Sequence, residues 1–207
     1  MILLITIEGI DGSGKSTLVE TLKRELVDLN CLFTREPGAT WIGTTVRQAI
    51  AKEEDPISEA LLFVADHAMH LKTIVRPALA EGRVVISDRF TDSRFAYQQV
   101  TLKGVVPDPR GWLTALHDGW SLTPDLTFLL VIPPAAALRR IDRDGLREHF
   151  EREEVLAAVQ QEYLARAEAE TERFVLIDAE EEMEAIASFV EDAIRRVCGS
   201  QAGHRRR

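Results

Sequence analysis

Short apolar runs alternate along the chain with longer segments in which apolar residues recur every three or four positions. Strands of a parallel sheet are buried on both faces, so they read as nearly continuous apolar runs. The runs therefore predict five buried parallel strands, of which the second is the weakest: 2–7, 32–34, 84–87, 126–132 and 174–178.

The periodic segments between these runs predict helices that carry the chain from one strand to the next. In the last segment, apolar residues from Met183 to Val197 recur at three- and four-residue spacing, which gives one face for packing on a sheet. We therefore expect an α/β fold, a three-layer α/β/α sandwich around roughly five parallel strands. The expected helices are 16–29, 56–81, 109–117, 135–143, 154–169 and 182–197.

The length of 207 residues suffices for one well-filled core. We expect a single domain over residues 1–199 and a short, frayed basic tail at 200–207. Cys31 and Cys198 are too few for a disulfide framework and indicate reduced thiols. The apolar run at 2–7 is too short for a signal peptide or a membrane span, so a cytoplasmic protein is expected.

Composition argues against two classes of partner. Hydrophobic residues make up 45% and charged residues 29% of the chain, as is usual for a soluble globular protein. The formal net charge of −9 argues against a nucleic-acid or membrane footprint, because both need a basic face. Neither nucleic acid nor a membrane is therefore expected as a partner.

The segment GIDGSGKST fits the phosphate-loop pattern G-x-x-x-x-G-K-[ST], with the strand before it and the helix after it that the pattern requires. Glycines allow the loop to aim backbone N–H groups at a polyphosphate. Lys15 is expected to reach the β- and γ-phosphates, and the Ser16 hydroxyl to bind Mg²⁺. The expected ATP-binding residues are Gly9, Ile10, Asp11, Gly12, Ser13, Gly14, Lys15, Ser16 and Thr17.

The segment SDRF ends the predicted strand at 84–87. An acid at the end of such a strand, here Asp88, is where phosphate-loop proteins hold Mg²⁺, and Arg89 beside it can meet a phosphate. The alternative is a structural ion pair between Asp88 and Arg89. The carboxyl edge of a parallel sheet is where ligands bind, which favours the first interpretation.

Two absences argue against a switch GTPase: the chain has no N-K-x-D segment, and no D-x-x-G follows the strand at 84–87. Arginines instead occur in several separate segments, which suits a phosphoryl group transferred between two anionic substrates. Each one alone could be a surface charge, so the indication comes from the set: Arg35, Arg47, Arg89, Arg94, Arg139, Arg140, Arg143 and Arg147.

Four segments together resemble the thymidylate kinase family, and their amino-acid sequences are most similar to archaeal members: GIDGSGKST, TREPGATWIGTTVR, LLFVADHAMH and SDRFTDSRFAYQ. The resemblance runs from Ile2 to about Ala179. It implies a P-loop nucleoside monophosphate kinase fold, Mg²⁺ as cofactor, a homodimer, and transfer of the γ-phosphate of ATP to dTMP, giving dTDP. The alternatives are another deoxynucleotide or deoxynucleoside kinase, or a phosphate-loop binding protein without activity.

The resemblance also implies roles for individual residues at the dTMP site. Asp11 would meet the sugar 3′-hydroxyl or the Mg²⁺ shell, Arg47 and Arg89 would clamp the phosphate, and Phe63 would stack on thymine. Tyr97 would lie against the sugar 2′ position. The full implied set is Asp11, Pro37, Arg47, Phe63, His67, Arg89, Ser93, Tyr97 and Gln98.

The densely charged stretch at 139–154 is similar to the lid that covers ATP in this family. Some members of this family carry a catalytic arginine in the phosphate loop and others carry it in the lid. The phosphate loop here contains no arginine, so the resemblance implies that the lid supplies it, from Arg143 or Arg147. Arg139 and Arg140 are expected on the helix leading in, and a solvated charged helix is the alternative. The expected catalytic residues are Lys15, Asp11, Arg89, Arg143 and Arg147.

His67 departs from the family pattern, because many members have arginine four residues after the stacking phenylalanine, where it reads thymine O4. His67 follows Phe63 by one helical turn, so we expect it near the edge of the base. There it could donate a hydrogen bond to O4. The alternative is a histidine bonded to a nearby carboxylate such as Asp66 or Asp92.

Overall fold

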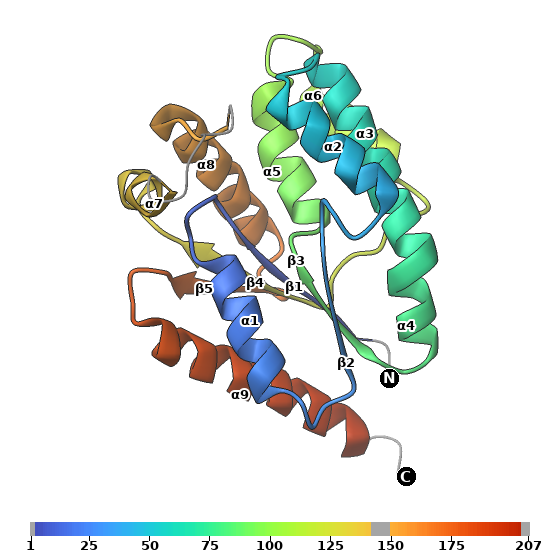
Figure 1. The fold of residues 1–207 in the computed structure, drawn as a ribbon, viewed down its shortest axis with the longest axis vertical. Helices are drawn as coiled ribbons and strands as arrows, with labels where there is room; N and C mark the ends of the chain where they lie inside the picture. The colour runs from blue at the N-terminus through green and yellow to red at the C-terminus, as the bar shows by residue number, and fades with distance from the viewer. Residues whose placement is uncertain (1–2, 142–149, 204–207) are drawn as a thin grey trace.

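The computed structural model describes residues 3–141 and 150–203. They form a five-stranded parallel sheet in the order β2-β3-β1-β4-β5 (Figure 1). All five predicted strands are confirmed: β1 (Leu3–Gly9), β2 (Cys31–Arg35), β3 (Val84–Asp88), β4 (Leu126–Val131) and β5 (Phe174–Asp178). Every residue of β1 is buried, as expected of a central strand covered on both faces.

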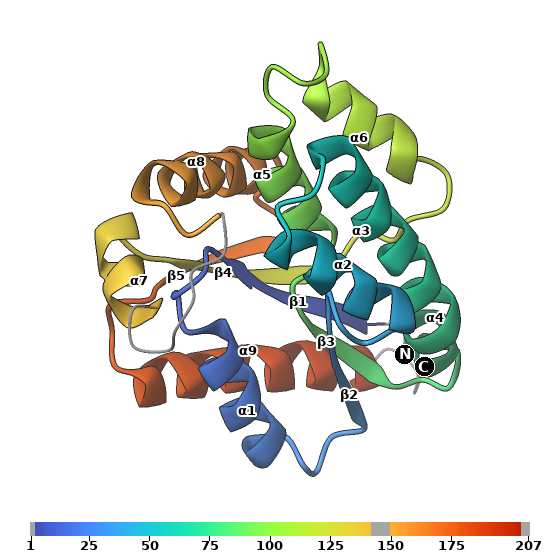
Figure 2. The ribbon, with the colours of Figure 1, turned by 45° about the horizontal axis from the view of Figure 1, so that its top comes forward.

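Helices cover both faces of the sheet, which confirms the three-layer sandwich. One face carries α1 (Lys15–Glu25) and α9 (Met183–Gly203), which contact each other (Figure 2). The opposite face carries a longer set: α2 (Trp41–Ala51), α3 (Pro56–His70), the π-helix η1 (Leu71–Val75), α4 (Arg76–Ala80), α5 (Thr91–Thr101), α6 (Pro109–His117) and α8 (Glu153–Ala169). The helix expected at 56–81 is thus α3, η1 and α4 in direct succession.

The sequence reading missed α2 and α5. Helix α5 is buried at every position from Thr91 to Gln98, so it lacks the polar stripe that makes a helix recognisable. Helix α2 starts at an N-cap, because Thr40 Oγ1 accepts hydrogen bonds from the backbone N–H groups of Ile42 and Gly43. Gly43, at the third position of α2, weakens the helical pattern further because glycine has a low helix propensity.

Two segments bear on the expected lid and tail. Arg139 and Arg140 lie on α7 (Pro134–Ile141), as predicted, whereas Arg143 and Arg147 lie outside the described residues. Helix α9 extends through Gly203, where a frayed terminus was expected from residue 200; residues 204–207 are outside the described part. No helix in the described residues is both long and apolar enough to cross a membrane.

Candidate active site

A cavity of about 670 Å³ opens where β1 and β3, which are neighbours in the sheet, end. Such an edge collects backbone N–H groups and loop side chains, because all strands point the same way. Fourteen of the predicted residues line this one cavity: Asp11, Gly12, Gly14, Lys15, Ser16, Thr17, Pro37, Arg47, Phe63, Asp88, Arg89, Ser93, Tyr97 and Gln98.

The phosphate loop has the backbone that its glycines allow. Gly9, Gly12 and Gly14 have φ values of 145°, 78° and 96°, which side-chain-bearing residues rarely adopt. A Cβ at Gly12 would also collide with the carbonyl of Ala137 on α7. The loop therefore presents its backbone directly to the cavity at the N-terminus of α1, where the helix dipole favours an anion.

Lys15 is almost fully buried at the start of α1. Its Nζ donates to the carbonyl oxygen of Ile10 at 2.8 Å and to Ser13 Oγ at 3.4 Å. Burial, together with the nearby Arg89 guanidinium, lowers the pKa of Lys15 to about 8. Gly9, Ile10 and Ser13 do not line the cavity, and their contacts with ATP stay predictions.

The two predicted Mg²⁺ ligands lie next to each other. Ser16 Oγ donates to Asp88 Oδ2 at 3.1 Å. Asp88 Oδ1 is buried and has no hydrogen-bond partner in the described part of the chain. The alternative of a structural Asp88–Arg89 ion pair is wrong for the described residues, because Arg89 pairs with Asp11 instead.

Arg89 crosses the phosphate loop in a strained conformation. Its φ of 66° is unusual for a residue other than glycine, and such outliers cluster at functional sites. Nη2 donates to Asp11 Oδ1 and, at 3.2 Å, to the Tyr97 hydroxyl; Nη1 donates to the carbonyl of Gly9 at 3.2 Å. Burial raises the pKa of Asp11, but Arg89 and Lys15 outweigh it, so this pKa lies below its usual value.

The buried carboxylate of Glu8, which was not predicted from the sequence, connects the residues next to Arg89 through hydrogen bonds. Glu8 Oε2 accepts hydrogen bonds from Ser93 Oγ at 2.6 Å and from the Tyr163 hydroxyl at 2.9 Å. Its Oε1 accepts from the Phe90 N–H at 2.7 Å. Burial and the nearby Asp92 raise the pKa of Glu8 to about 7. The only sequence signal was a charged residue inside an apolar strand.

The other end of the cavity collects side chains from β2, α2, α3 and α5. Arg47 Nη2 donates to the carbonyl of Pro37 at 3.1 Å, so the predicted phosphate clamp contacts the segment 35–38 at the end of β2. Phe63 also faces this end. Both the amide nitrogen and the amide oxygen of Gln98 are buried without partners in the described residues. This end of the cavity therefore combines an aromatic ring with polar groups whose hydrogen-bonding capacity is unsatisfied among the described residues.

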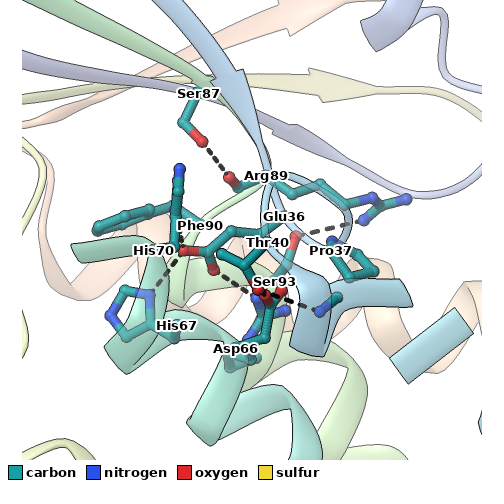
Figure 3. A network of polar contacts seen from close by, with 12 residues as sticks. Glu36, Pro37, Thr40, Asp66, His67, His70, Ser87, Arg89, Phe90 and Ser93 are labelled. Atoms are coloured by element: carbon teal, nitrogen blue, oxygen red, sulfur yellow. Dashed lines mark hydrogen bonds and ion pairs between the residues drawn. The ribbon is translucent and has the colours of Figure 1, made fainter. Parts of the chain in front are cut away.

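The predicted contact between His67 and the base is wrong. His67 is fully buried and does not line the cavity. Its Nδ1 lies 2.8 Å from Glu36 Oε1 (Figure 3). Its Nε2 lies 2.9 Å from Ser121 Oγ. The alternative of a carboxylate-bound histidine is thus right in kind, but the partner is Glu36 rather than Asp66 or Asp92.

Helix geometry explains why Phe63 and His67 have different neighbours. Two residues four positions apart differ by about 40° around a helix axis, so sharing a side does not mean sharing a neighbour. Phe63 reaches the cavity wall, whereas His67 turns behind it toward Glu36 and packs edge-on against Phe90, with ring centroids 4.7 Å apart.

Several cavity residues lie outside the predicted ligand set. Phe150 packs edge-on against Tyr97, with ring centroids 5.4 Å apart, and Glu151 lines the cavity beside it. Their signal was present, since both belong to the charged stretch expected to form the lid. The further lining residues are Arg35, Glu36, Ile50, Arg94, Arg140 and Ile141.

Comparisons with known proteins agree with this geometry. The family model described as thymidylate kinase matches residues 7–190. A probable thymidylate kinase from Methanoculleus marisnigri is 56% identical over 204 residues, which is 99% of this chain and 98% of that protein. One from Methanospirillum hungatei JF-1 is 56% identical over 93% of this chain and 94% of its own length.

A solved structure supports the same conclusion. The crystal structure of thymidylate kinase from Ehrlichia chaffeensis superimposes with a TM-score of 0.72 at 28% sequence identity. The match covers 94% of this chain and 98% of that one. The similarity therefore extends over nearly the whole of both chains.

Proposed function

The chain belongs to the thymidylate kinase family and transfers the γ-phosphate of ATP to dTMP, giving dTDP. From this premise we propose which part of the cavity binds ATP and which part binds dTMP. The observation that supports the proposal most is that a phosphate loop and a cluster of arginines share one cavity of about 670 Å³. Two anionic substrates can therefore meet there without water between them.

The phosphate loop is the proposed donor half. The N–H groups at the start of α1 and the Lys15 ammonium hold the phosphates of ATP. Mg²⁺ fits between Ser16 and Asp88, because the hydroxyl and the unpaired Asp88 Oδ1 are the hard oxygen ligands it prefers. When bound, the ion neutralises charge on the phosphates, and the residues of this chain orient them.

The arginine cluster is the proposed acceptor half. Arg89 and Arg47 hold the phosphate of dTMP, with Arg89 fixed in place by Asp11 and Tyr97. An oxygen of that phosphate attacks the γ-phosphorus, and the bond to the bridging oxygen of ADP breaks. Arg89 lies between the loop and α5, so its charge acts where the two substrates meet.

The lid stays a proposal, since Arg143 and Arg147 are outside the described residues. We assign to one of them the role of the catalytic arginine, because the phosphate loop contains no arginine. Arg140, on the helix leading in, lines the cavity and donates through Nη2 to the carbonyl of Ala179 at 3.0 Å. That contact anchors the start of the lid next to the donor half.

We also propose a homodimer in the cytoplasm. Trp41 on α2 and Leu61 on α3 are 71% and 44% exposed, although both are large apolar side chains. These two helices pack against each other on the outside of the sandwich (Figure 2). The two exposed apolar side chains therefore lie on neighbouring helices. Burial in a second copy would remove this surface from water.

A coupled assay with ATP and Mg²⁺ tests the function. We expect dTDP from dTMP, and much lower kcat/KM with thymidine, dCMP, dGMP or dAMP. Faster turnover of any of these acceptors would establish the alternative, another deoxynucleotide or deoxynucleoside kinase. Tight ATP binding with no product from any acceptor would establish a binding protein instead.

A further inference from the structure

The burial of His67 leaves the recognition of the base to other groups. Arg94, on α5, is only 2% exposed and yet lines the acceptor end of the cavity together with Phe63 and Gln98. A buried arginine in a ligand cavity is costly unless its donors are used, because each unmet hydrogen bond leaves a desolvated group.

Two contacts hold the Arg94 guanidinium in a defined plane. Its carbon lies 4.6 Å from the centroid of the Phe63 ring, a cation–π contact. Its Nη2 donates to Glu36 Oε2 in an ion pair whose partners are both fully or almost fully buried. The planar guanidinium therefore cannot rotate freely beside the ring on which the base is proposed to stack.

Glu36 is in turn held by two histidines. His67 Nδ1 and His70 Nδ1 lie 2.8 and 2.6 Å from Glu36 Oε1. Burial raises the pKa of Glu36, but its interactions with His67, Arg94 and His70 outweigh burial and hold this pKa well below its usual value. A carboxylate only accepts, so both histidines donate from Nδ1, and Oε2 stays available for Arg94.

Part of the hydrogen-bonding capacity of this wall is unused. Arg94 Nε is buried and has no partner in the described residues, and the same holds for both polar atoms of the Gln98 amide. Buried groups of this kind are rare in folded proteins and call for an explanation. A donor from Arg94 next to a donor and an acceptor from Gln98 matches a ligand edge that carries carbonyl oxygens and one N–H.

We propose that Arg94, held by Glu36, recognises the 4-carbonyl of the pyrimidine and that Gln98 pairs with the adjacent N3–H. The inference rests on dTMP as the acceptor. Thymine and uracil both present O4 and N3–H, whereas cytosine presents a 4-amino group and a bare N3. Against cytosine, the Arg94 donor would face another donor, which leaves a desolvated polar group unpaired. His67 and His70 act as positioning residues through Glu36.

The test compares kcat/KM for dTMP, dCMP and dUMP in the wild type and in Arg94→Met, a variant of similar size without donors. We expect the dTMP-to-dCMP ratio to fall by about 5- to 150-fold, the effect of one unpaired polar contact. The dTMP-to-dUMP ratio should stay within about threefold, because both bases share the recognised edge. Arg166→Met is the matched control: it too removes a cation–π arginine paired with a carboxylate, but outside the cavity.

An unchanged dTMP-to-dCMP ratio in folded Arg94→Met overturns the inference and assigns the base edge to Gln98 alone. If that variant does not fold, the double variant Arg94→Met, Glu36→Gln removes both partners of the ion pair, so no buried carboxylate is left unpaired, and its ratio must still fall. An unchanged ratio there is equally decisive. Failure of the wild type to make dTDP would instead contradict the proposed function, so the two failures are distinguishable.

Discussion

The Ser16 hydroxyl donates a hydrogen bond to Asp88 Oδ2 at 3.1 Å, although 72 residues separate them in the chain. This contact joins the first turn of α1 to the end of β3. It places a hydroxyl and a carboxylate side by side at the rim of the phosphate loop, with Asp88 Oδ1 still unpaired in the described residues. Two oxygen ligands from different elements can thus serve one Mg²⁺.

Asp88→Asn should raise the Mg²⁺ concentration that gives half-maximal rate by roughly 10- to 100-fold, because the amide carries no charge to attract the ion. A magnesium titration of the initial rate at saturating ATP measures it. Asp178→Asn, at the end of β5 and outside the cavity, is the control and should leave the titration unchanged. Equal titrations for both variants would remove Asp88 from the Mg²⁺ site.

Lys15→Ala should lower kcat by at least about 100-fold, because the ammonium neutralises charge on the transferring phosphoryl group. The fold should persist, since alanine removes a buried cation and suits a helix. Lys23→Ala, on the exposed side of the same helix, should keep near-normal turnover. If circular dichroism shows folded Lys15→Ala and its kcat lies within tenfold of wild type, Lys15 does not have this role.

Replacing the essential lid arginine should lower kcat by roughly 10²- to 10⁵-fold, the range for an arginine that stabilises phosphoryl transfer. We expect this of Arg143→Ala or Arg147→Ala, with a smaller change in KM for dTMP. Arg196→Ala, exposed on α9 and outside the cavity, is the control. Near-normal kcat in both lid variants would mean that the required charge comes from another part of the cavity.

His67→Ala should lower the free energy of unfolding by about 2–4 kcal/mol, because it leaves a cavity and takes a donor from Glu36. Urea denaturation measures the loss. Lys72→Ala, exposed one turn further along, should change stability by less than about 0.5 kcal/mol. A His67 variant as stable as wild type would show that the buried pair with Glu36 contributes nothing.

Glu8 makes stability depend on pH. Its pKa is about 7 in the folded chain against 4.5 when unperturbed, so the folded state binds more protons between these values. The free energy of unfolding should therefore fall as pH rises from about 4.5 to 7. Glu8→Gln cannot ionise, so its stability relative to wild type should increase between pH 5 and pH 8.

Urea denaturation at the two pH values tests this, with Glu20→Gln as control, because Glu20 is exposed on α1. The control should show the same pH dependence as the wild type. A parallel dependence in Glu8→Gln as well would mean that other groups cause it, and that Glu8 is ionised throughout.

Local sequence was enough for the sheet and the phosphate loop, whereas most of the remaining cavity wall was predicted from the family resemblance. A buried strand is an uninterrupted apolar run. The glycines of the loop determine its backbone conformation, and the lysine stands within the same short motif. Both features can therefore be recognised within ten residues of sequence. Asp88 and Arg89 follow from the end of one strand, whereas Ser93 and Tyr97 lie on α5, a helix that local periodicity did not reveal, and only the family resemblance brought them into the predicted site.

Partners across the fold could not be read in this way. The environment of His67 depends on Glu36, 31 residues before it, and Ser121, 54 residues after it, and periodicity reports a helix face but not what packs there. The same holds for Glu8 with Tyr163, 155 residues apart, and for α5, whose burial on every side erased its amphipathic signal. Long-range packing decided these features, since a buried polar group takes whichever partner the assembled layers bring within hydrogen-bond reach.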